Sequence, residues 1–303
     1  MAPDASRDRP PDPSCHVSIY TLTGLPSWST GPRDPASASA FAEIAAAGYA
    51  GVQLDDPART AAAAPLAVSG MARLLHAADV DGLAAAHADA GLVCTTLHLG
   101  HGLESEDEAC RLVEAVLDAT SRRGYPLFVE THRATITQDM RRTLDLVARF
   151  PELRFNIDIV NWYAGLEMPY GDLAGKLDAL APVFARARYI HGRIGNSAVM
   201  QVPLPASGAE PEYIDHFRDV WTRCARGYLA GGEFTLPLIF APELLPAWIE
   251  TGGRRAMIYY AALDADGAET SDRWEDGLRL CDMMRDCYAA AASGDAVGFV
   301  GTA

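Results

Sequence analysis

One pattern recurs along most of the sequence: a helical segment, often closed by a glycine, is followed at once by a short apolar segment with strand-like spacing. The pairs are residues 37–48 and 49–54, 80–91 and 92–99, 109–124 and 125–130, 137–152 and 153–160, and 172–187 and 188–194. Short links of this kind require parallel strands joined by crossover helices. The sequence therefore predicts an α/β fold, a (β/α)8-type TIM barrel, regular or irregular, with an outer helix layer.

The strand count falls one short of a full barrel. A first strand is expected at residues 16–23 and a last one at 235–243, after an amphipathic helix at 211–229, which gives seven strands in all. An eighth strand either lies in the alanine-rich stretch 58–80 or is missing from an irregular barrel. A final helix is expected at 271–292, where apolar residues recur every three or four positions.

Bulk properties place the chain in a broad class. Residues 1–14 are rich in proline and charge and are expected to be a disordered tail, whereas 303 residues suit one TIM-barrel domain over 15–303. The absence of any apolar run of 18 residues or of a signal-like segment predicts a cytoplasmic protein without membrane contact. A formal charge of −15 argues against a nucleic-acid partner, and six scattered cysteines without a CxxC motif are expected to be reduced.

Composition also excludes two kinds of chemistry. The only lysine is Lys176, which lies in a predicted helix, so Schiff-base aldol chemistry and covalent pyridoxal phosphate lack their nucleophile. No GxGxxG or GxxxxGK loop is present, so nucleotide cofactors are not indicated.

Polar residues stand where four consecutive predicted strands end. These residues are Glu130, Asp158, His191 and Glu243. Because the working residues of a barrel lie at the C-terminal ends of its strands, the four side chains are expected to converge. Three carboxylates on one rim repel each other unless a cation lies among them, so the pattern favours a divalent metal over four independent polar caps. Oxygen-rich ligation with one nitrogen suits Mn²⁺ first, with Mg²⁺, Co²⁺ or Zn²⁺ as alternatives.

Four segments resemble a known family, the xylose-isomerase-like TIM barrels, which include sugar phosphate isomerase/epimerase-like proteins. They are ETHRATIT (130–137), DIVNWYAGLEM (158–168), HGRIGNSAVMQV (191–202) and FAPELLP (240–246). The resemblance extends from about residue 16 to about 290. It implies an eight-stranded barrel and a metal held by two glutamates, an aspartate and a histidine or glutamine, which carry over to the same four positions, Glu130, Asp158, His191 and Glu243.

One position departs from the pattern. The resemblance leads us to expect Asp-Phe-Ser-His-Trp where this chain has DIVNW, so Asn161 replaces a histidine. Asparagine does not exchange protons near neutral pH, which implies an altered substrate, an altered reaction or reduced activity.

Further residues are candidates for the site. His132 shares the inward face of its strand with Glu130 and is either a second acid/base or a group that orients Glu130. Arg193 either clamps a substrate oxygen or neutralises the carboxylates. Substrate contacts are also expected from four residues near strand ends, namely His98, His101, Asn161 and Trp162.

These residues and the resemblance predict an isomerase or epimerase that acts on a small sugar or polyol through an enediolate, with Glu130 and Glu243 as acid and base. A lyase that dehydrates a keto-polyol or a dehydroshikimate-like compound is the alternative within the same chemistry. A non-catalytic binding protein on a decayed barrel is the alternative from another class, with Asn161 as its support. A zinc-dependent DNA-repair nuclease fits poorly with eight histidines and an acidic surface. Assembly into a homo-oligomer is compatible with the sequence.

Overall fold

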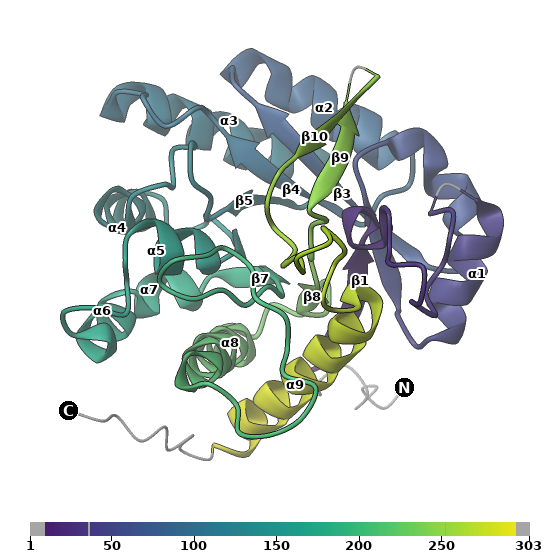
Figure 1. Cartoon of the computed structure of the whole chain (residues 1–303). Helices are drawn as coiled ribbons and strands as arrows, with labels where there is room; N and C mark the ends of the chain where they lie inside the picture. Colours follow the sequence, from purple (N-terminus) through teal and green to yellow (C-terminus); the bar gives the residue numbers. More distant parts are fainter. Residues whose placement is uncertain (1–9, 36, 252, 295–303) are drawn as a thin grey trace, which may run out of the picture.

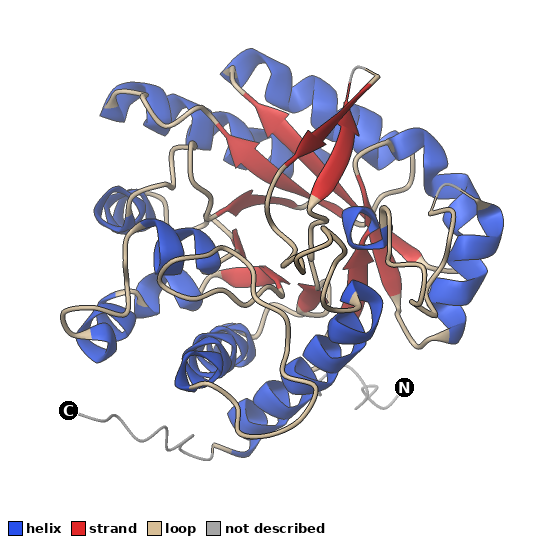
Figure 2. Ribbon diagram, viewed as in Figure 1, coloured by secondary structure: helices blue, strands red, loops and turns tan. Residues whose placement is uncertain are grey.

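The computed structural model describes residues 10–294 except 36 and 252, and its central feature is a closed barrel of eight parallel strands. The strands follow one another around the barrel in chain order, and β1 closes the ring by pairing with β8 through Ser14–Ile239 and Cys15–Phe240. Helices surround the strands (Figures 1 and 2). The predicted TIM barrel is confirmed.

The barrel strands are short and almost completely buried. They are β1 (Ser14–Ser18), β2 (Gly51–Leu54), β3 (Ala67–Leu74), β4 (Cys94–Leu99), β5 (Leu127–Glu130), β6 (Phe155–Ile157), β7 (Ala187–His191) and β8 (Ile239–Ala241). Seven of them coincide with the predicted segments. The first ends earlier than expected, because the chain turns into a 3-10 helix, η2 (Ile19–Leu22), in which the Thr21 hydroxyl donates to the Pro242 carbonyl.

The eighth strand is β3, which lies inside the alanine-rich stretch 58–80 and completes a regular barrel. Its sequence, AVSGMARL, has a single β-branched residue, Val68, and no aromatic residue, although residues of these types usually mark a strand. Gly70 is required there, because a Cβ would lie 2.7 Å from both the Leu92 and Thr95 side chains of the neighbouring segment. Tight packing against β4 therefore selects small residues and hides the strand from a propensity-based prediction.

The helices pack on the outside of the strands and connect them. They are α1 (Ala38–Ala46), α2 (Val80–Asp89), α3 (Glu106–Arg123), α4 (Met140–Arg149), α5 (Val160–Gly165), α6 (Leu173–Ala179), α7 (Ala181–Phe184), α8 (Glu212–Gly231) and α9 (Arg273–Ser293), with short 3-10 helices η3 (Pro57–Ala63) and η4 (Ala77–Asp79). The last helix contributes Trp274, Cys281 and Met284 to the core, as its spacing predicts.

The sequence does not predict the antiparallel hairpin of β9 (Trp248–Thr251) and β10 (Arg254–Met257), inserted between β8 and α9. In Figure 1 the hairpin and the chain after it cross in front of the barrel strands. This insertion brings Tyr260 to the C-terminal end of the barrel, where it contacts Arg133 and Arg193.

Other expectations concern the termini and the cysteines. Residues 1–9 of the expected tail and 295–303 of the expected domain lie outside the described residues, while Ser14, assigned to the tail, is the first residue of β1. All six cysteines are free thiols and buried, as expected of reduced residues. Among the described residues, no helix combines the length and the apolar character that crossing a membrane requires.

Candidate metal centre

The four residues predicted from strand ends do meet at the C-terminal end of the barrel. Glu130 is the last residue of β5, Asp158 follows β6, His191 ends β7 and Glu243 lies two residues after β8. Atoms of Glu130, Asp158 and His191 able to bind a metal lie within 4.8 Å of one another, and all three side chains are fully buried. Glu243 joins them, with Oε2 3.7 Å from His191 Nδ1. We call these four residues the strand-end cluster.

The imidazole of His191 is oriented by hydrogen bonds from the barrel interior. Gln53 on β2 donates from Nε2 to Thr96 Oγ1 (3.0 Å), so its carbonyl oxygen is left to accept from His191 Nε2 (3.1 Å). The opposite ring atom, Nδ1, then faces Glu130 Oε1 at 3.5 Å. A metal-binding histidine commonly has its other nitrogen held in this way, with the free lone pair aimed at the ion.

Arg193 lies inside the cluster and compensates part of its negative charge. Its guanidinium is buried, contacts Asp158 Oδ2 closely and lies 3.3 Å from Glu243 Oε2. Burial still raises the pKa of Asp158 to about 6, against the opposing charge of Arg193. Burial lowers the pKa of His191, but the charges of Glu130 and Glu243 outweigh it and raise the pKa to about 9. The cluster therefore attracts positive charge.

The donor atoms fit a divalent cation. Glu130 Oε1 and Asp158 Oδ1 are buried and accept no aligned hydrogen bond from the residues that the structure describes. Buried carboxylate oxygens are rarely left without a partner, because desolvating them costs free energy. Arg193 contacts Asp158 through Oδ2, which leaves Oδ1 without a partner among the described residues. Two carboxylates and one imidazole thus offer a compact set of oxygen and nitrogen ligands.

A second group of potential ligands surrounds the same glutamate. His98 Nε2 lies 3.1 Å from Glu130 Oε1, and the rings of His98 and His132 stack with centroids 4.1 Å apart. Burial lowers the pKa of His98, but the charge of Glu130 outweighs it and raises the pKa. Burial lowers the pKa of His132 to about 4. Of these two imidazoles, His98 is thus the one whose protonated form Glu130 favours.

Asn161 and Trp162 stabilise the chain that follows β5. Asn161 is buried and donates from Nδ2 to the carbonyls of Thr131 (3.3 Å) and Asp158 (3.4 Å), while its Oδ1 accepts from the Arg133 amide (3.3 Å). The Trp162 indole is fully buried and donates to the Thr137 carbonyl (2.9 Å). Both contacts are with the protein itself, so a substrate contact by Trp162 is not supported by its position.

His101 is not brought to the cluster either. Its side chain is 56% exposed and lies 3.5 Å from Glu104, while its backbone amide donates to the same carboxylate. His101 therefore belongs to the turn after β4.

The structure adds residues that the strand-end rule misses. Asn156 on β6 donates from Nδ2 to Glu130 Oε2 (2.9 Å), and Gln53 holds His191. Both face the barrel interior, and Asn156 could have been found by strand alternation, because it lies two residues before Asp158. Arg133 and Tyr260 lie at the mouth, and no periodicity in the sequence indicates them.

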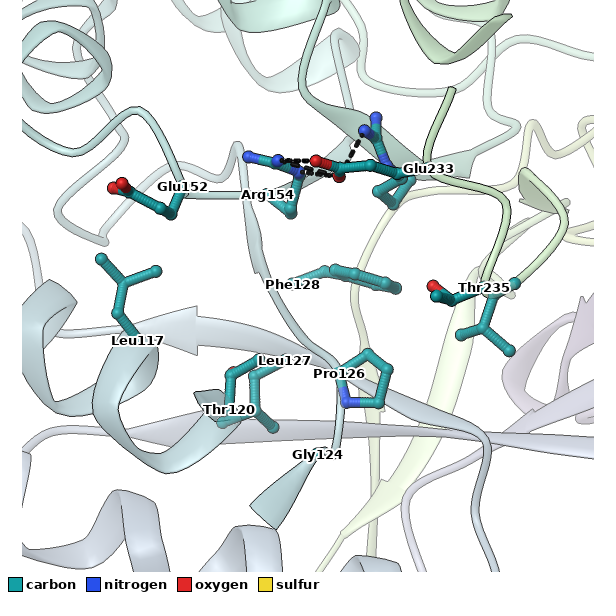
Figure 3. Close-up of a pocket in the computed structure, with 12 residues that line it drawn as sticks. Leu117, Thr120, Gly124, Pro126, Leu127, Phe128, Glu152, Arg154, Glu233 and Thr235 are labelled. Carbon is teal, nitrogen blue, oxygen red and sulfur yellow. Dashed lines mark hydrogen bonds and ion pairs between the residues drawn. The ribbon is translucent and has the colours of Figure 1, made fainter. Parts of the chain in front are cut away.

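The opposite end of the barrel has a cavity of about 270 Å³ near the start of β5. Figure 3 shows Glu233 beside Arg154, with their hydrogen bonds at 2.9–3.3 Å, above an apolar floor that includes Phe128 and Pro126. Arg188 binds the same carboxylate. Polar residues at this end of a barrel usually serve stability, and here Glu233 is paired with both arginines.

The fold and the strand-end cluster define a TIM barrel with a candidate metal centre at the end where such barrels carry their active sites. Comparison of the sequence with protein-family models gives no match, and comparison with curated proteins gives none either. Solved structures do resemble the chain. A D-tagatose 3-epimerase-like protein is 10% identical, with a TM-score of 0.54 over 93% of this chain and 99% of its own.

Two further structures have the same fold. A sugar phosphate isomerase/epimerase from Parabacteroides distasonis is 14% identical, with a TM-score of 0.51 over 99% of this chain and 100% of its own. A xylose isomerase-like TIM barrel protein from Mycobacterium smegmatis, in complex with magnesium, is 12% identical, with a TM-score of 0.50 over 91% and 97%. The resemblance inferred from the sequence is thus confirmed in fold.

Proposed function

We propose that the protein is a divalent-metal-dependent isomerase or epimerase of a small sugar or polyol. The observation that supports this most is the position of two carboxylates close to one imidazole atom: His191 Nδ1 lies 3.5 Å from Glu130 Oε1 and 3.7 Å from Glu243 Oε2. The carboxylates come from β5 and β8, which are not neighbours in the barrel. Two such groups can act on one carbon from different directions.

A divalent ion held by Glu130, Asp158, His191 and Glu243 would polarise adjacent hydroxyl and carbonyl oxygens and acidify the neighbouring C–H bond. Glu130 or Glu243 then removes that proton, and the other carboxylate returns it. Proton return to the same carbon from the other face gives an epimer, and return to the adjacent carbon gives aldose–ketose isomerisation. His98, which lies beside Glu130, stabilises the carboxylate form of that residue.

Structural neighbours support the proposal without extending it. Two of the solved structures are described as epimerase-like and isomerase/epimerase proteins. The third, the xylose isomerase-like protein, is in complex with magnesium. We propose Mn²⁺ or Mg²⁺ as the ion, because hard oxygen ligands outnumber nitrogen in the strand-end cluster.

Elemental analysis of the purified protein tests the metal first. We expect about one equivalent of a divalent ion in the wild type and loss of the ion in a Glu130→Gln, Asp158→Asn variant, which removes two ligand charges but keeps side-chain shape. Glu233→Gln, at the other end of the barrel, is the matched control and should retain the ion. Absence of a specific ion in the wild type, even after addition of Mn²⁺, would overturn the proposal.

Proton transfer is tested separately by incubating the metal-loaded protein with ketoses and aldoses in D₂O. We expect deuterium at the carbon next to the carbonyl, detected by NMR, and its loss in Glu130→Gln and in Glu243→Gln. A new ultraviolet-absorbing conjugated product would instead identify the lyase alternative, which begins with the same proton removal. A bound ion without any exchange across the panel would favour a binding protein.

A further inference from the structure

Two arginines at the mouth of the barrel carry charge that no carboxylate neutralises. Arg73 on β3 and Arg133 after β5 are exposed, and neither forms an ion pair with a carboxylate of the described residues. The molecule as a whole carries a charge of −15, so positive charge left unpaired next to the strand-end cluster is a local feature against the general background.

Arg133 is held in place from several sides. Its amide donates to Asn161 Oδ1 (3.3 Å), and its NH2 group donates to the Tyr260 hydroxyl (2.7 Å). Arg73 donates to the carbonyl of Ala134, the residue after Arg133 (3.1 Å). The guanidinium of Arg133 is therefore positioned before any ligand arrives, which lowers the entropy cost of binding.

The residues next to Arg133 and Tyr260 in the sequence have strained backbones. Ala134 has φ +55° and Tyr259 has φ +61°, a region that residues with a Cβ seldom occupy. They directly follow Arg133 and directly precede Tyr260. Strain of this kind persists where surrounding contacts hold the chain, and it concentrates at binding sites.

The Tyr260 ring connects Arg133 with the interior of the site. Its centroid lies 5.9 Å from the Arg133 guanidinium carbon and 5.2 Å from that of Arg193. The hydroxyl accepts from Arg133 and donates to none of the residues that the structure describes, so its proton is available. Arg193 has two buried nitrogens, Nε and NH1, without a hydrogen-bond partner among the described residues. Hydrogen-bond donors of Arg193 and Tyr260 that have no acceptor among the described residues therefore extend from the strand-end cluster to the mouth of the barrel.

We propose that the substrate carries an anionic group, a carboxylate or a phosphate, at the end remote from the reacting carbon, and that Arg133 and Tyr260 bind this group. The guanidinium presents its remaining N–H groups and the phenol its O–H to the anion. One carboxylate at the mouth, Asp55 after β2, accepts a hydrogen bond from Tyr20 (2.5 Å), while Arg73 contacts the chain after β4 and β5. The anion therefore lies on the β4–β5 side.

This inference rests on the proposed function for the identity of the reacting end, but its test does not depend on turnover. We would titrate metal-free protein with inorganic phosphate and, separately, with acetate, and measure each dissociation constant by calorimetry or NMR. Metal-free protein is needed because a bound ion would itself attract both anions. The anion with the lower dissociation constant identifies the class of group that the substrate carries.

Substitutions then locate the binding group. Arg133→Gln should weaken anion binding by about tenfold or more, the effect of losing a charge-assisted hydrogen bond. Arg133→Lys keeps the charge without the planar fork and should give an intermediate loss, and Tyr260→Phe should weaken binding about threefold or more. Arg285→Gln, which removes an exposed arginine of α9 that pairs with Asp282, changes the net charge equally and should leave binding unchanged.

Equal dissociation constants in the wild type and in Arg133→Gln, or no saturable binding of either anion, would overturn the inference. Circular dichroism of each variant verifies folding. Metal analysis of the same proteins as purified, before the metal is removed, separates the two proposals: Arg133-dependent anion binding in a protein that binds no metal would sink only the proposed enzyme, and a metal without anion binding would sink only the anion subsite.

Discussion

Asn161 has a structural role that a histidine in its place would not fill. Its amide group supplies two donors and one acceptor, and all are used, by the carbonyls of Thr131 and Asp158 and by the amide of Arg133. A neutral imidazole has one donor and one acceptor. The asparagine that the sequence presents as a departure from the resemblance is therefore fitted to the chain after β5 in this protein.

We predict that Asn161→His destabilises the protein by about 2 kcal/mol, because at least one buried backbone group loses its partner. Urea unfolding followed by circular dichroism measures the change. An unchanged stability together with faster deuterium exchange into sugars would show instead that the asparagine marks a lost catalytic histidine.

Asp276 on α9 gives a pH-dependent prediction away from the strand-end cluster. Burial raises the pKa of its carboxyl to about 6, although the Leu204 amide donates to it (3.3 Å). The folded protein then binds the proton more tightly than the unfolded chain, so this group's contribution to stability is complete below pH 3.8 and is lost as pH rises through about 6.

Asp276→Asn keeps the acceptor for Leu204 and removes the charge. We expect the variant to be more stable than the wild type by about 2 kcal/mol at pH 8, with the difference shrinking towards pH 4, since one pKa unit corresponds to about 1.4 kcal/mol. Urea unfolding at several pH values gives the profile. A difference that does not vary with pH would show that the effect does not come from the charge of Asp276.

At the level of single residues, the sequence predicted the parts of the site that regular strands position. Glu130, Asp158 and His191 end or follow strands, and parallel strands bring such positions together irrespective of loop detail. Tyr260 reaches the mouth through an irregular insertion after β8, and Arg133 through hydrogen bonds with Asn161 and Tyr260. These positions depend on tertiary contacts that leave no periodic signal.

At the scale of secondary-structure elements, β3 and the β9–β10 hairpin show what the sequence could not predict. Gly70 and the alanines of β3 are selected by close packing against β4, which opposes the usual strand propensities. The hairpin packs outside the barrel, so the alternation of strands and helices does not require it. For α3 the sequence predicted the end before Gly124, but the helix begins at Glu106, three residues before the predicted start at 109.

The start of α3 has a capping box. Ser105 Oγ accepts from the Glu108 amide (3.3 Å), and Glu108 Oε2 accepts from the Ser105 amide (2.8 Å). We predict that Ser105→Ala lowers the free energy of unfolding by about 1 kcal/mol. Ser121→Ala, at an exposed position near the end of the same helix, should leave stability unchanged or slightly higher. Equal losses in both variants would contradict a capping role.

At the scale of the whole molecule, the two ends of the barrel differ in how their charges are used. At the N-terminal end, Glu233 is bound by both Arg154 and Arg188, so these three charges have partners within the described chain. At the C-terminal end, carboxylate oxygens and arginine N–H groups are buried without partners. The first arrangement stabilises an isolated protein, and the second would be completed by the cation and the anionic ligand that we propose.

The position of the strand-end cluster predicts that a metal stabilises the barrel. Its residues come from or directly follow β5, β6, β7 and β8, so an ion would link four consecutive strands. The unfolded chain has no such preformed site, and an ion at a hundred times its dissociation constant adds about 2.7 kcal/mol to the free energy of unfolding. For a chain of this size, that corresponds to a rise in melting temperature of about 4 °C.

Calorimetry of the metal-free protein with and without Mn²⁺ or Mg²⁺ measures this rise, and EDTA should reverse it. The Glu130→Gln, Asp158→Asn variant lacks two carboxylates whose mutual repulsion the ion relieves. It should melt at or above the temperature of the metal-free wild type and show no rise with metal. Glu233→Gln should melt lower, because Arg154 and Arg188 lose their shared partner, yet keep the full rise. An equal rise in all three proteins would place the ion outside the strand-end cluster.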